Sequence, residues 1–587
     1  MCGIFGFVAG GERSPGIVLD GLRYLEYRGY DSWGVAVAEG GRVLAEKAIG
    51  TIAAARISLP PSRVALGHTR WATHGGVTEA NAHPHADCRG RFALIHNGIV
   101  ENHQELRLRL ARPHAFRSQT DTEVLVHLLE ETVDGEPDLL TALLQVFRQV
   151  EGLSAVAVLD AGTGQVVVAK NGSPVVLGWG TDAAYLASDP MALLEHTRQI
   201  TFLEDGQAAS LSPDGIRIAD VHTGQSCRPE IRTVTWDTQL SGLDGYPHFM
   251  AKEIHEQPRI LREVAGGKRV EAAQLANLIR ASDDVYLIGC GTAHHAAMSA
   301  RYMLSEIGNH ASTAVPASEM SLVYPRLGPR SLVIALSQSG ETIDVLEAVR
   351  EARQTGATVA ALVNAEGSTL DRFADLSILL GCGPERCVLA TKSYTAKLAM
   401  LQLVAHALAG SLDRGVRQLF EAGHRVQAVL DREAVDGTIA ETARQIAGEQ
   451  HLFVLGRHRN YPPALEAALK IKEVSYLHAE GFASGELKHG VIALVTYGTP
   501  CLILAPDGDY RREVLGAAAE VGARGARTIG LSPQPEAEFD ITLPIAGGTS
   551  GSYEIAACSQ LLAYKLALLR GCDPDKPRNL AKSVTVK

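Results

Sequence analysis

Residues 332–349 read Leu-Val-Ile-Ala-Leu-Ser-Gln-Ser-Gly-Glu-Thr-Ile-Asp-Val-Leu-Glu-Ala-Val. The apolar run 332–336 has the length of a buried strand, and the polar, glycine-containing stretch 337–342 predicts a tight turn after it. Apolar residues then recur at 345, 346 and 349, which is the spacing of one helix face. Strand, turn and helix in this order form the unit of a parallel sheet covered by helices, so the stretch predicts an α/β fold around it.

The same pattern repeats through the last two thirds of the chain. Its apolar runs are 285–288, 332–336 and 358–363, followed by 452–455, 501–505 and 527–531. Gly289 and Gly456 end the first run of each set and differ by 167 positions, while 345–346 and 514–515 differ by 169. These similar offsets predict an internal duplication, with two doubly wound α/β domains at 251–425 and 435–575.

Residues 1–225 have a different rhythm, in which short strand-like runs alternate with turn residues. The runs are 4–8, 34–38, 92–96, 155–159 and 166–169. They predict an α+β domain of layered antiparallel sheets with helices. The polar stretch 226–250, with its Gly and Pro residues, predicts a linker, and the alternating apolar residues of 576–587 predict an ordered C-terminal tail.

Composition excludes several classes of protein. The chain has 587 residues and a formal net charge of −11, so it lacks the positive surface with which proteins bind nucleic acid or an anionic membrane. We find neither the roughly 20 apolar residues that span a bilayer nor a secretion signal, so we expect a cytoplasmic protein.

Cysteine and histidine spacing predicts no metal site. The nine cysteines contain no C-x-x-C pair, which argues against a disulfide framework and against zinc. His83, His85 and Cys88 could form part of a metal cluster, but no fourth ligand stands near them in the sequence. We therefore interpret them as ordinary loop residues.

The second residue is a candidate nucleophile. Removal of the initiator methionine exposes Cys2, and its own α-amine can then act as the base for its thiol. An amide hydrolase also needs groups that hold its substrate. Arg70 can pair with a carboxylate, Asp121 can hold an ammonium group, and Asn97 with the Gly98 N–H can form an oxyanion hole. Each has an ordinary alternative as a surface charge or a turn residue.

A second set of candidates lies in the duplicated region. Ser337, Ser339 and Thr342 place three hydroxyls at the predicted start of a helix, which suits a phosphate group, although a serine-rich helix cap is the alternative. Lys470 and Glu473 share one helix face, either as catalytic groups or as a solvated ion pair. His489 lies in a glycine-bounded turn, and Lys582 lies in the tail, where burial can activate a lysine.

The first 225 residues resemble the N-terminal-nucleophile glutamine amidotransferases. The motifs that carry the resemblance are Cys2-Gly3-Ile4-Phe5-Gly6, His68-Thr69-Arg70-Trp71-Ala72-Thr73-His74-Gly75 and His96-Asn97-Gly98, with Asp121. The resemblance implies that Cys2 attacks the side-chain amide of glutamine and that Trp71 gates an ammonia passage. It implies glutamine binding by Arg70, Thr73, His74, Gly98 and Asp121.

The remainder resembles a pair of sugar isomerase domains, and the full order with the tail 579–586 resembles the glutamine:fructose-6-phosphate aminotransferase family. This implies conversion of fructose 6-phosphate and glutamine to glucosamine 6-phosphate and glutamate, without a cofactor, by a homodimer or higher homo-oligomer. It implies that His489 of a neighbouring subunit opens the sugar ring, that Lys582 forms an imine, and that Glu473, assisted by Lys470, moves a proton between C1 and C2. It implies sugar-phosphate binding by Thr292, Ser337, Gln338, Ser339 and Thr342.

Two positions depart from the pattern of this family. Ala293 and Ala390 stand where the family usually has serine. Each loses a hydroxyl worth about 0.5 to 1.5 kcal/mol if it made a hydrogen bond. This leaves open the same chemistry on another ketose phosphate. A sugar-phosphate sensor without catalysis is a further alternative, but a sensor would not need Cys2, Glu473, His489 and Lys582.

Overall fold

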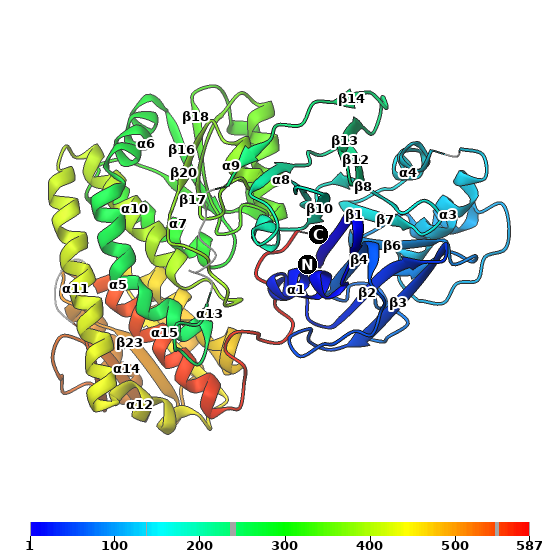
Figure 1. Cartoon of the computed structure of the whole chain (residues 1–587). Coiled ribbons are helices and arrows are strands. Elements are labelled where there is room, and N and C mark those ends of the chain that lie inside the picture. The colour runs from blue at the N-terminus through cyan, green and yellow to red at the C-terminus, as the bar shows by residue number, and fades with distance from the viewer. Residues whose placement is uncertain (1, 137, 235–241, 546–550, 586–587) are drawn as a thin grey trace. The chain divides into compact units, whose positions relative to one another are not determined.

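The computed structural model describes residues 2–136, 138–234, 242–545 and 551–585 (Figure 1). They belong to two compact units. The first runs from the N-terminus to residue 239 and includes the end of the chain from Ser583, and the second runs from 240 to 582. Part of the predicted linker, 235–241, and the last two residues of the predicted tail, 586–587, lie outside the described residues.

The first unit contains two antiparallel sheets. The eight-stranded sheet has the order β15 (Arg232–Thr233), β11 (Gln199–Phe202), β9 (Val176–Trp179), β10 (Ala183–Ala187), β1 (Gly3–Arg13), β4 (Ser62–Arg70), β2 (Ser32–Glu39) and β3 (Arg42–Ile49). The seven-stranded sheet has the order β14 (Ser226–Cys227), β13 (Gly215–Asp220), β12 (Gln207–Ser212), β8 (Gln165–Asn171), β7 (Ser154–Asp160), β6 (Phe92–Gly98) and β5 (His85–Ala86). The predicted layered antiparallel architecture is confirmed.

Alternate side chains of β1 point to opposite faces of its sheet and pack against the layers on either side. Ile4 and Val8 belong to the core between the two sheets, whereas Phe5 and Phe7 pack on the opposite face with Leu22 of α1 (Gly16–Tyr24). This is the two-residue period of a strand that is buried on both faces. The 3₁₀ turns η1 (Glu26–Arg28) and η2 (Pro190–Leu193) lie at the same outer face.

Helices cover the outer face of the seven-stranded sheet. They are α2 (His103–Leu108), α3 (Glu123–Val133) and α4 (Leu139–Phe147). α4 begins where the Asp138 carboxylate accepts a hydrogen bond of 3.0 Å from the Thr141 N–H. The unit is therefore built of four layers: helix, sheet, sheet and helix.

The second unit contains two parallel sheets of five strands with the same topology. The first has the order β17 (Thr313–Pro316), β16 (Asp284–Gly289), β18 (Ser331–Leu336), β19 (Thr358–Val363) and β20 (Leu376–Leu379). The second has the order β22 (His478–Ala483), β21 (His451–Gly456), β23 (Pro500–Leu504), β24 (Arg527–Ser532) and β25 (Ile541–Pro544). The predicted pair of doubly wound units is confirmed.

The helices of the second unit join the two copies through one core. They are α5 (Phe249–Gly267), α6 (Arg269–Ala281), α7 (Thr292–Glu306), α8 (Ile343–Gln354), α9 (Thr369–Phe373), α10 (Lys392–Leu408), α11 (Leu412–Asp436), α12 (Thr438–Ile446), α13 (Tyr461–Ser475), α14 (Arg511–Gly522) and α15 (Gly551–Leu569). The shared core contains Leu287 of β16 and Val454 of β21 together with Tyr394 of α10 and Tyr553 of α15. The short 3₁₀ turns are η4 (Ala317–Leu322), η5 (Tyr324–Arg326), η6 (His458–Asn460), η7 (Ser484–His489) and η8 (Val491–Leu494).

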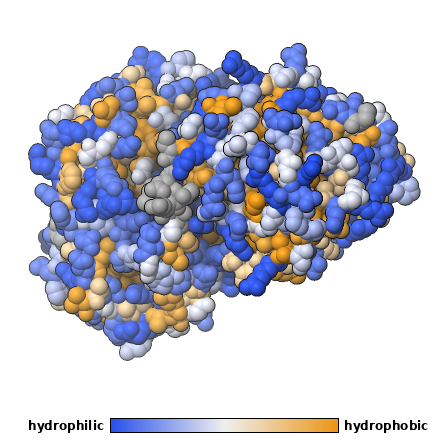
Figure 2. All heavy atoms as spheres, viewed as in Figure 1, coloured by the Kyte–Doolittle hydropathy of each residue, from blue (hydrophilic) through white to orange (hydrophobic). Residues whose placement is uncertain are grey.

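The surface that Figure 2 presents is mostly hydrophilic, with apolar side chains between the polar ones. Within the described part of the chain, no helix combines the length and the apolar character needed to cross a membrane. Some large apolar side chains of the second unit are nevertheless exposed. Leu494 of η8 is 58% exposed and Tyr497 just after it is 93% exposed.

Candidate active sites

Cys2 lies immediately before β1, beside the residue that follows β4. The Trp71 N–H donates a hydrogen bond to Cys2 Sγ, with 3.2 Å between nitrogen and sulfur. Close packing of the two strands requires glycine next to the cysteine, because a Cβ on Gly3 would lie 2.7 Å from Thr69 Oγ1. Burial raises the pKa of the Cys2 thiol, although the Trp71 N–H and the charge of Arg70 oppose this effect. The sulfur therefore needs a base before it can attack.

Asn97 and Gly98, at the end of β6, lie on the other side of Cys2. Asn97 Nδ2 donates to the carbonyl oxygen of Cys2 at 3.0 Å and to Ser188 Oγ at 2.9 Å. Gly98 has a φ of +136°, and a Cβ there would lie 2.0 Å from the Leu153 carbonyl oxygen, so only glycine fits. In this state the Asn97 amide positions the backbone of the cysteine.

Arg70 ends β4 and holds the loop that carries the predicted glutamine-binding residues. Its guanidinium donates to the carbonyl oxygens of His74 at 2.5 Å, Gly75 at 3.2 Å and Gly76 at 3.2 Å. Burial lowers the pKa of Arg70, while Cys2, Asp31 and Asp121 are the neighbouring groups whose negative charge opposes this. The charges predicted to hold an amino acid are therefore near the cysteine.

Asp121 reaches the same region from the start of α3, where its Oδ2 accepts a hydrogen bond of 2.6 Å from the Val100 N–H. Of the two loop residues predicted to bind glutamine, Thr73 is exposed and His74 is half-buried. His74 lies edge to face with His103, with 5.5 Å between ring centroids. The structure thus places all these groups around one loop.

Buried imidazoles lie beneath this site. His83 stacks on His68 with 4.3 Å between ring centroids and lies 4.7 Å from His85. Burial lowers the pKa of His68 and of His85 to about 3, and that of His83 well below 6.5. His83 Nδ1 accepts a hydrogen bond of 3.1 Å from the His96 N–H, so this ring is neutral in the fold.

Replacing His83 with Asn is expected to make the first unit less sensitive to acid. The folded pKa of His83 is depressed, so below about pH 6.5 the unfolded chain binds more protons and stability falls as the pH falls. Asn can keep an acceptor toward His96 without titrating. We expect the slope of stability against pH, between about pH 5 and about pH 6.5, to become shallower by up to about 1.4 kcal/mol per pH unit.

Urea unfolding of the full-length protein across this pH range checks the prediction. His424→Asn is the matched control, because His424 is exposed on α11. The explanation fails if H83N and wild type show the same slope.

The predicted phosphate loop connects β18 to α8 in the second unit. Ser337 Oγ accepts a hydrogen bond of 2.9 Å from the Gly340 N–H, and Ser339 Oγ accepts one of 3.2 Å from the Glu341 N–H. Gly340 has a φ of +66°, and a Cβ there would lie 2.0 Å from Ser368 Oγ. Gln338 Oε1 is buried and lacks a hydrogen-bond partner, and Thr342 is the N-cap of α8. The loop thus forms a compact N-terminal turn for α8, in which the Gln338 side-chain oxygen lacks a hydrogen-bond partner.

Lys470 and Glu473 form a buried ion pair on α13. Lys470 Nζ lies 2.7 Å from Glu473 Oε2 and 3.6 Å from Glu466 Oε1. Burial raises the pKa of Glu473, and the charge of Lys470 only partly opposes this. For Lys470, burial alone would lower the pKa, but the two carboxylates outweigh burial and raise it. The interpretation of this set as a solvated ion pair is wrong, because Lys470 is 1% exposed.

Glu466 also connects this pair to the predicted sugar-binding residue on α7. Thr292 Oγ1 donates to Glu466 Oε1 at 3.0 Å, and His295 Nδ1 lies 2.8 Å from Glu466 Oε2. His294 and His295 directly follow Ala293, and exposed helix histidines are the ordinary interpretation of such a pair, but both are half-buried. Packing of α7 against α13 explains the difference.

Lys582, from the C-terminal segment, is buried against Glu385. Its Nζ lies 2.6 Å from Glu385 Oε2 and 3.0 Å from the Leu389 carbonyl oxygen. Burial would raise the pKa of Glu385, but Lys582 and hydrogen bonds lower it to about 2. Burial lowers the pKa of Lys397, which is influenced by both Glu385 and Glu466, to about 8. The second unit thus contains a set of buried charged groups.

His489 is not part of this buried set. It ends η7 and is exposed. The structure therefore brings together Thr292, Lys470 and Glu473, holds Lys582 on Glu385, and leaves His489 at the surface.

Known proteins match both units and the chain as a whole. A family model for the glutamine amidotransferase domain matches residues 53–212, and one for the SIS domain matches 278–407 and 445–539. The chain is 40% identical over 613 residues to a protein of Symbiobacterium thermophilum and 42% identical over 611 residues to one of Thermus thermophilus. Both are named glutamine–fructose-6-phosphate aminotransferase (isomerizing), and each alignment covers 100% of both chains.

The chain belongs to the glutamine–fructose-6-phosphate aminotransferase (isomerizing) family. Among solved structures, it is similar to the C-terminal domain of glucosamine-fructose-6-phosphate aminotransferase from Francisella tularensis. That match has 30% sequence identity and a TM-score of 0.53, and it covers 57% of this chain and 100% of the other.

Some buried acids of this aminotransferase fold could not be recognised from the sequence. Glu253 of α5 accepts hydrogen bonds from the Cys387 N–H at 3.0 Å and from Thr391 Oγ1 at 2.7 Å. Burial and the charge of Glu385 raise the pKa of Glu253 to about 7. Lys397 did carry a signal, because it is a charge within the mostly apolar stretch 396–401, whereas the residues around Glu253 are polar and gave none.

Proposed function

We propose that this chain makes glucosamine 6-phosphate and glutamate from fructose 6-phosphate and glutamine. The observation that carries the proposal is the presence, in one member of this family, of the Cys2 site and of the buried Lys470–Glu473 pair. The first has the groups of an amide hydrolase. The second has the groups of a proton-transfer site for a sugar.

In the first unit, the Cys2 sulfur attacks the side-chain carbonyl carbon of glutamine. The α-amine that methionine removal exposes takes the thiol proton and returns it to the departing nitrogen, which leaves as ammonia. Water then hydrolyses the glutamyl thioester to glutamate. Arg70 and Asp121 pair with the α-carboxylate and the α-ammonium of the substrate, which requires the 74–76 loop to rearrange around Arg70.

In the second unit, the hydroxyls of the 337–342 loop bind the phosphate of fructose 6-phosphate. Lys582 gives its proton to a neighbouring base, attacks C2 of the open ketose and forms an imine with loss of water. Ammonia adds to that carbon and expels the lysine amine. Glu473 then removes a proton from C1 of the sugar imine and delivers one to C2, while the Lys470 ammonium stabilises the carboxylate.

His489 serves the sugar site of a second copy of this chain, where it opens the ring. Its exposure supports this role, because a histidine at the surface of its own unit can reach a neighbouring subunit. The exposed apolar side chains of Leu494 and Tyr497 follow it closely in sequence and suit a protein interface. We therefore expect at least a homodimer.

An isotope experiment tests the whole reaction. The protein is incubated with fructose 6-phosphate and glutamine labelled with ¹⁵N in its side-chain amide, in the presence of excess unlabelled ammonium. We expect labelled glucosamine 6-phosphate, little diluted by the unlabelled ammonium, because ammonia passes from one site to the other without mixing with the solution. Glutamate without an aminated sugar would contradict the acceptor assignment.

Other ketose phosphates provide the control for the identity of the sugar that accepts ammonia. Ala293 and Ala390 are both half-buried near the predicted sugar site, and the same assay with other ketose phosphates shows whether they change its specificity. Preferred amination of another ketose phosphate would replace fructose 6-phosphate in the proposal and leave the glutaminase intact. A protein that binds the sugar but yields neither product would be a sensor.

A further inference from the structure

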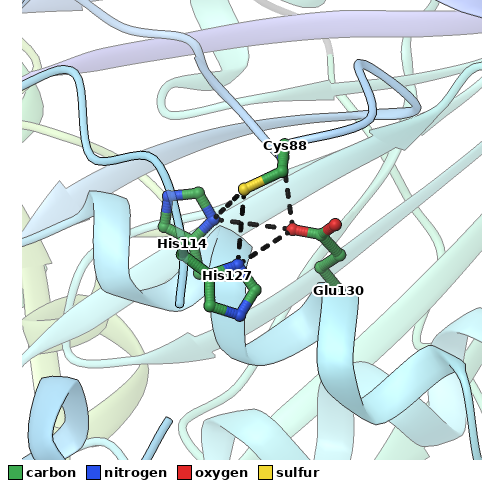
Figure 3. A group of neighbouring side chains, drawn as sticks. All are labelled: Cys88, His114, His127 and Glu130. Atoms are coloured by element: carbon green, nitrogen blue, oxygen red, sulfur yellow. Dashed lines mark hydrogen bonds and ion pairs between the residues drawn. The ribbon is translucent and has the colours of Figure 1, made fainter. Parts of the chain in front are cut away.

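Four side chains of the first unit that the proposed reaction does not use meet at one point (Figure 3). They are Cys88, His114, His127 and Glu130, here called the Cys88 cluster, and their facing atoms all lie within 4.8 Å of one another. Cys88 lies in the turn between β5 and β6, and His114 in the segment between α2 and α3. His127 and Glu130 lie on α3, three residues apart and thus on one face.

The distances within the Cys88 cluster fit a tetrahedral metal ion. Cys88 Sγ lies 3.4 Å from His114 Nδ1 and 3.7 Å from His127 Nδ1. Glu130 Oε2 lies 3.2 Å from His114 Nδ1 and 3.6 Å from His127 Nδ1. With ordinary zinc bond lengths and tetrahedral angles, sulfur and nitrogen ligands lie about 3.6 Å apart, and nitrogen and oxygen ligands about 3.4 Å apart.

The surroundings of the two rings orient them as ligands. His114 Nε2 lies 2.9 Å from Glu131 Oε1, and His127 Nε2 lies 3.8 Å from Glu123 Oε1. At His114 the carboxylate at hydrogen-bond distance favours the tautomer that keeps its proton on Nε2, so Nδ1 presents a lone pair to the cluster. At His127 the Glu123 carboxylate lies beyond hydrogen-bond distance of Nε2, and its negative charge favours the same tautomer. The Ala115 N–H donates to Cys88 Sγ at 3.4 Å, which stabilises a thiolate.

The balance of hydrogen-bond donors and acceptors in the Cys88 cluster favours a cation between its four side chains. In that tautomer, two Nδ1 atoms, one carboxylate oxygen and one sulfur face each other, and the thiol proton is the only side-chain proton among them. Two backbone N–H groups also donate to the cluster, that of Cys88 to Glu130 Oε2 at 3.2 Å and that of Ala115 to Cys88 Sγ at 3.4 Å. The imidazole and carboxylate groups are buried, with His114 1%, His127 0% and Glu130 4% exposed at the side chain. The two Nδ1 lone pairs still converge on a sulfur and a carboxylate oxygen with a single side-chain proton to share, which is costly in such a place, and a metal ion would satisfy all four groups.

We propose that the Cys88 cluster binds one zinc(II) ion through four protein ligands. Thiolate and imidazole ligands favour zinc over magnesium or calcium, and a closed set of four is typical of structural rather than catalytic zinc. The charges of Cys88 and Glu130 would balance those of the ion. Arg89 and Arg112, whose nitrogens lie 3.6 Å and 3.9 Å from Glu130 Oε1, are the other charged groups that face this carboxylate.

The site would fasten the segment between α2 and α3 to the sheet. This segment contains His114 and leads directly to Asp121, so the ion would also help to fix that residue, a consequence that rests on the proposed function. Glu123 strengthens the connection, because its carboxylate accepts hydrogen bonds from the Arg117 N–H at 2.6 Å and the Ser118 N–H at 2.7 Å.

Spacing along the sequence did not reveal this site. The sequence grouped Cys88 with His83 and His85, but these rings have other partners. His83 Nδ1 accepts from the His96 N–H, and His85 Nε2 lies 3.0 Å from Thr120 Oγ1. The ligands that meet Cys88 come from 26 to 42 residues further along the chain.

Metal analysis of the full-length protein tests the proposal. Protein purified without a metal-affinity step and dialysed against metal-free buffer is expected to retain about one zinc per chain by mass spectrometry of the elements. After replacement of zinc by cobalt(II), we expect the thiolate-to-cobalt charge-transfer band and the intense visible bands of a tetrahedral site. Cys88→Ser should remove the charge-transfer band and weaken zinc binding at least about tenfold.

Cys227→Ser is the matched control, since Cys227 is a partly exposed cysteine of the same unit outside the cluster. Near-ultraviolet circular dichroism establishes that each variant is folded. A folded wild-type protein that neither retains zinc nor takes up added zinc or cobalt would overturn the proposal, and would show that protons hold the cluster together. A charge-transfer band that persists in C88S would also overturn it.

Discussion

Cys2→Ala is expected to lower glutamine hydrolysis by about 10³-fold or more, because it removes the proposed nucleophile and leaves only substrate binding. The substitution should not disturb the fold. Cys2 precedes β1, and the hydrogen bond from Asn97 is to its backbone carbonyl oxygen, which alanine keeps. The loss should therefore appear in kcat, with little change in the affinity for glutamine.

Glutamate release measures the first reaction, and exchange of hydrogen between glucosamine 6-phosphate and deuterated water measures the second, because this sugar already carries the amino group and needs no ammonia. We expect C2A to lose the first and to keep the second, because the proposed proton-transfer groups lie in the other unit. Cys227→Ala should leave both unchanged. Glutamate release by C2A within about tenfold of wild type would show that another group attacks the amide.

The patterns in the sequence were sufficient to predict the architecture of the two parallel sheets. A parallel strand buried on both faces is a continuous apolar run, so 332–336 and 358–363 could be recognised one at a time. The repeated order of the two parallel sheets followed from the offset between Gly289 and Gly456.

The sites were only partly predictable. Cys2, Asn97 and Ser337 adjoin strands and carry a local signal. Glu385, the partner of Lys582, carries no such local signal. It is 197 residues away from Lys582 in the sequence, and only the tertiary fold brings the two together. The burial of Glu466 on α13 is also a tertiary effect, since its helix is covered by α7 and α15. The sequence could suggest candidate reactive groups, but not the buried charges that lie beside them.

Glu473→Gln is expected to lower the rate of glucosamine 6-phosphate formation by about 10² to 10⁴-fold, the usual contribution of a general base. Glutamine keeps the size of the side chain and an oxygen that faces Lys470, but it cannot accept the proton from C1. Lys470 remains paired with Glu466 at 3.6 Å, so the buried ammonium keeps a counter-charge. The raised pKa of Glu473 supports this role, because burial makes the carboxylate a stronger base.

Deuterium uptake from solvent into the sugar isolates this step, because it follows the proton transfer itself. We expect E473Q to lose uptake in parallel with product formation and to keep glutamine hydrolysis. Glu513→Gln is the matched control, since Glu513 is exposed on α14 of the same unit. If E473Q still incorporated deuterium at the wild-type rate, the base would have to be sought among the other buried acids, beginning with Glu466, whose Oε1 also faces Lys470.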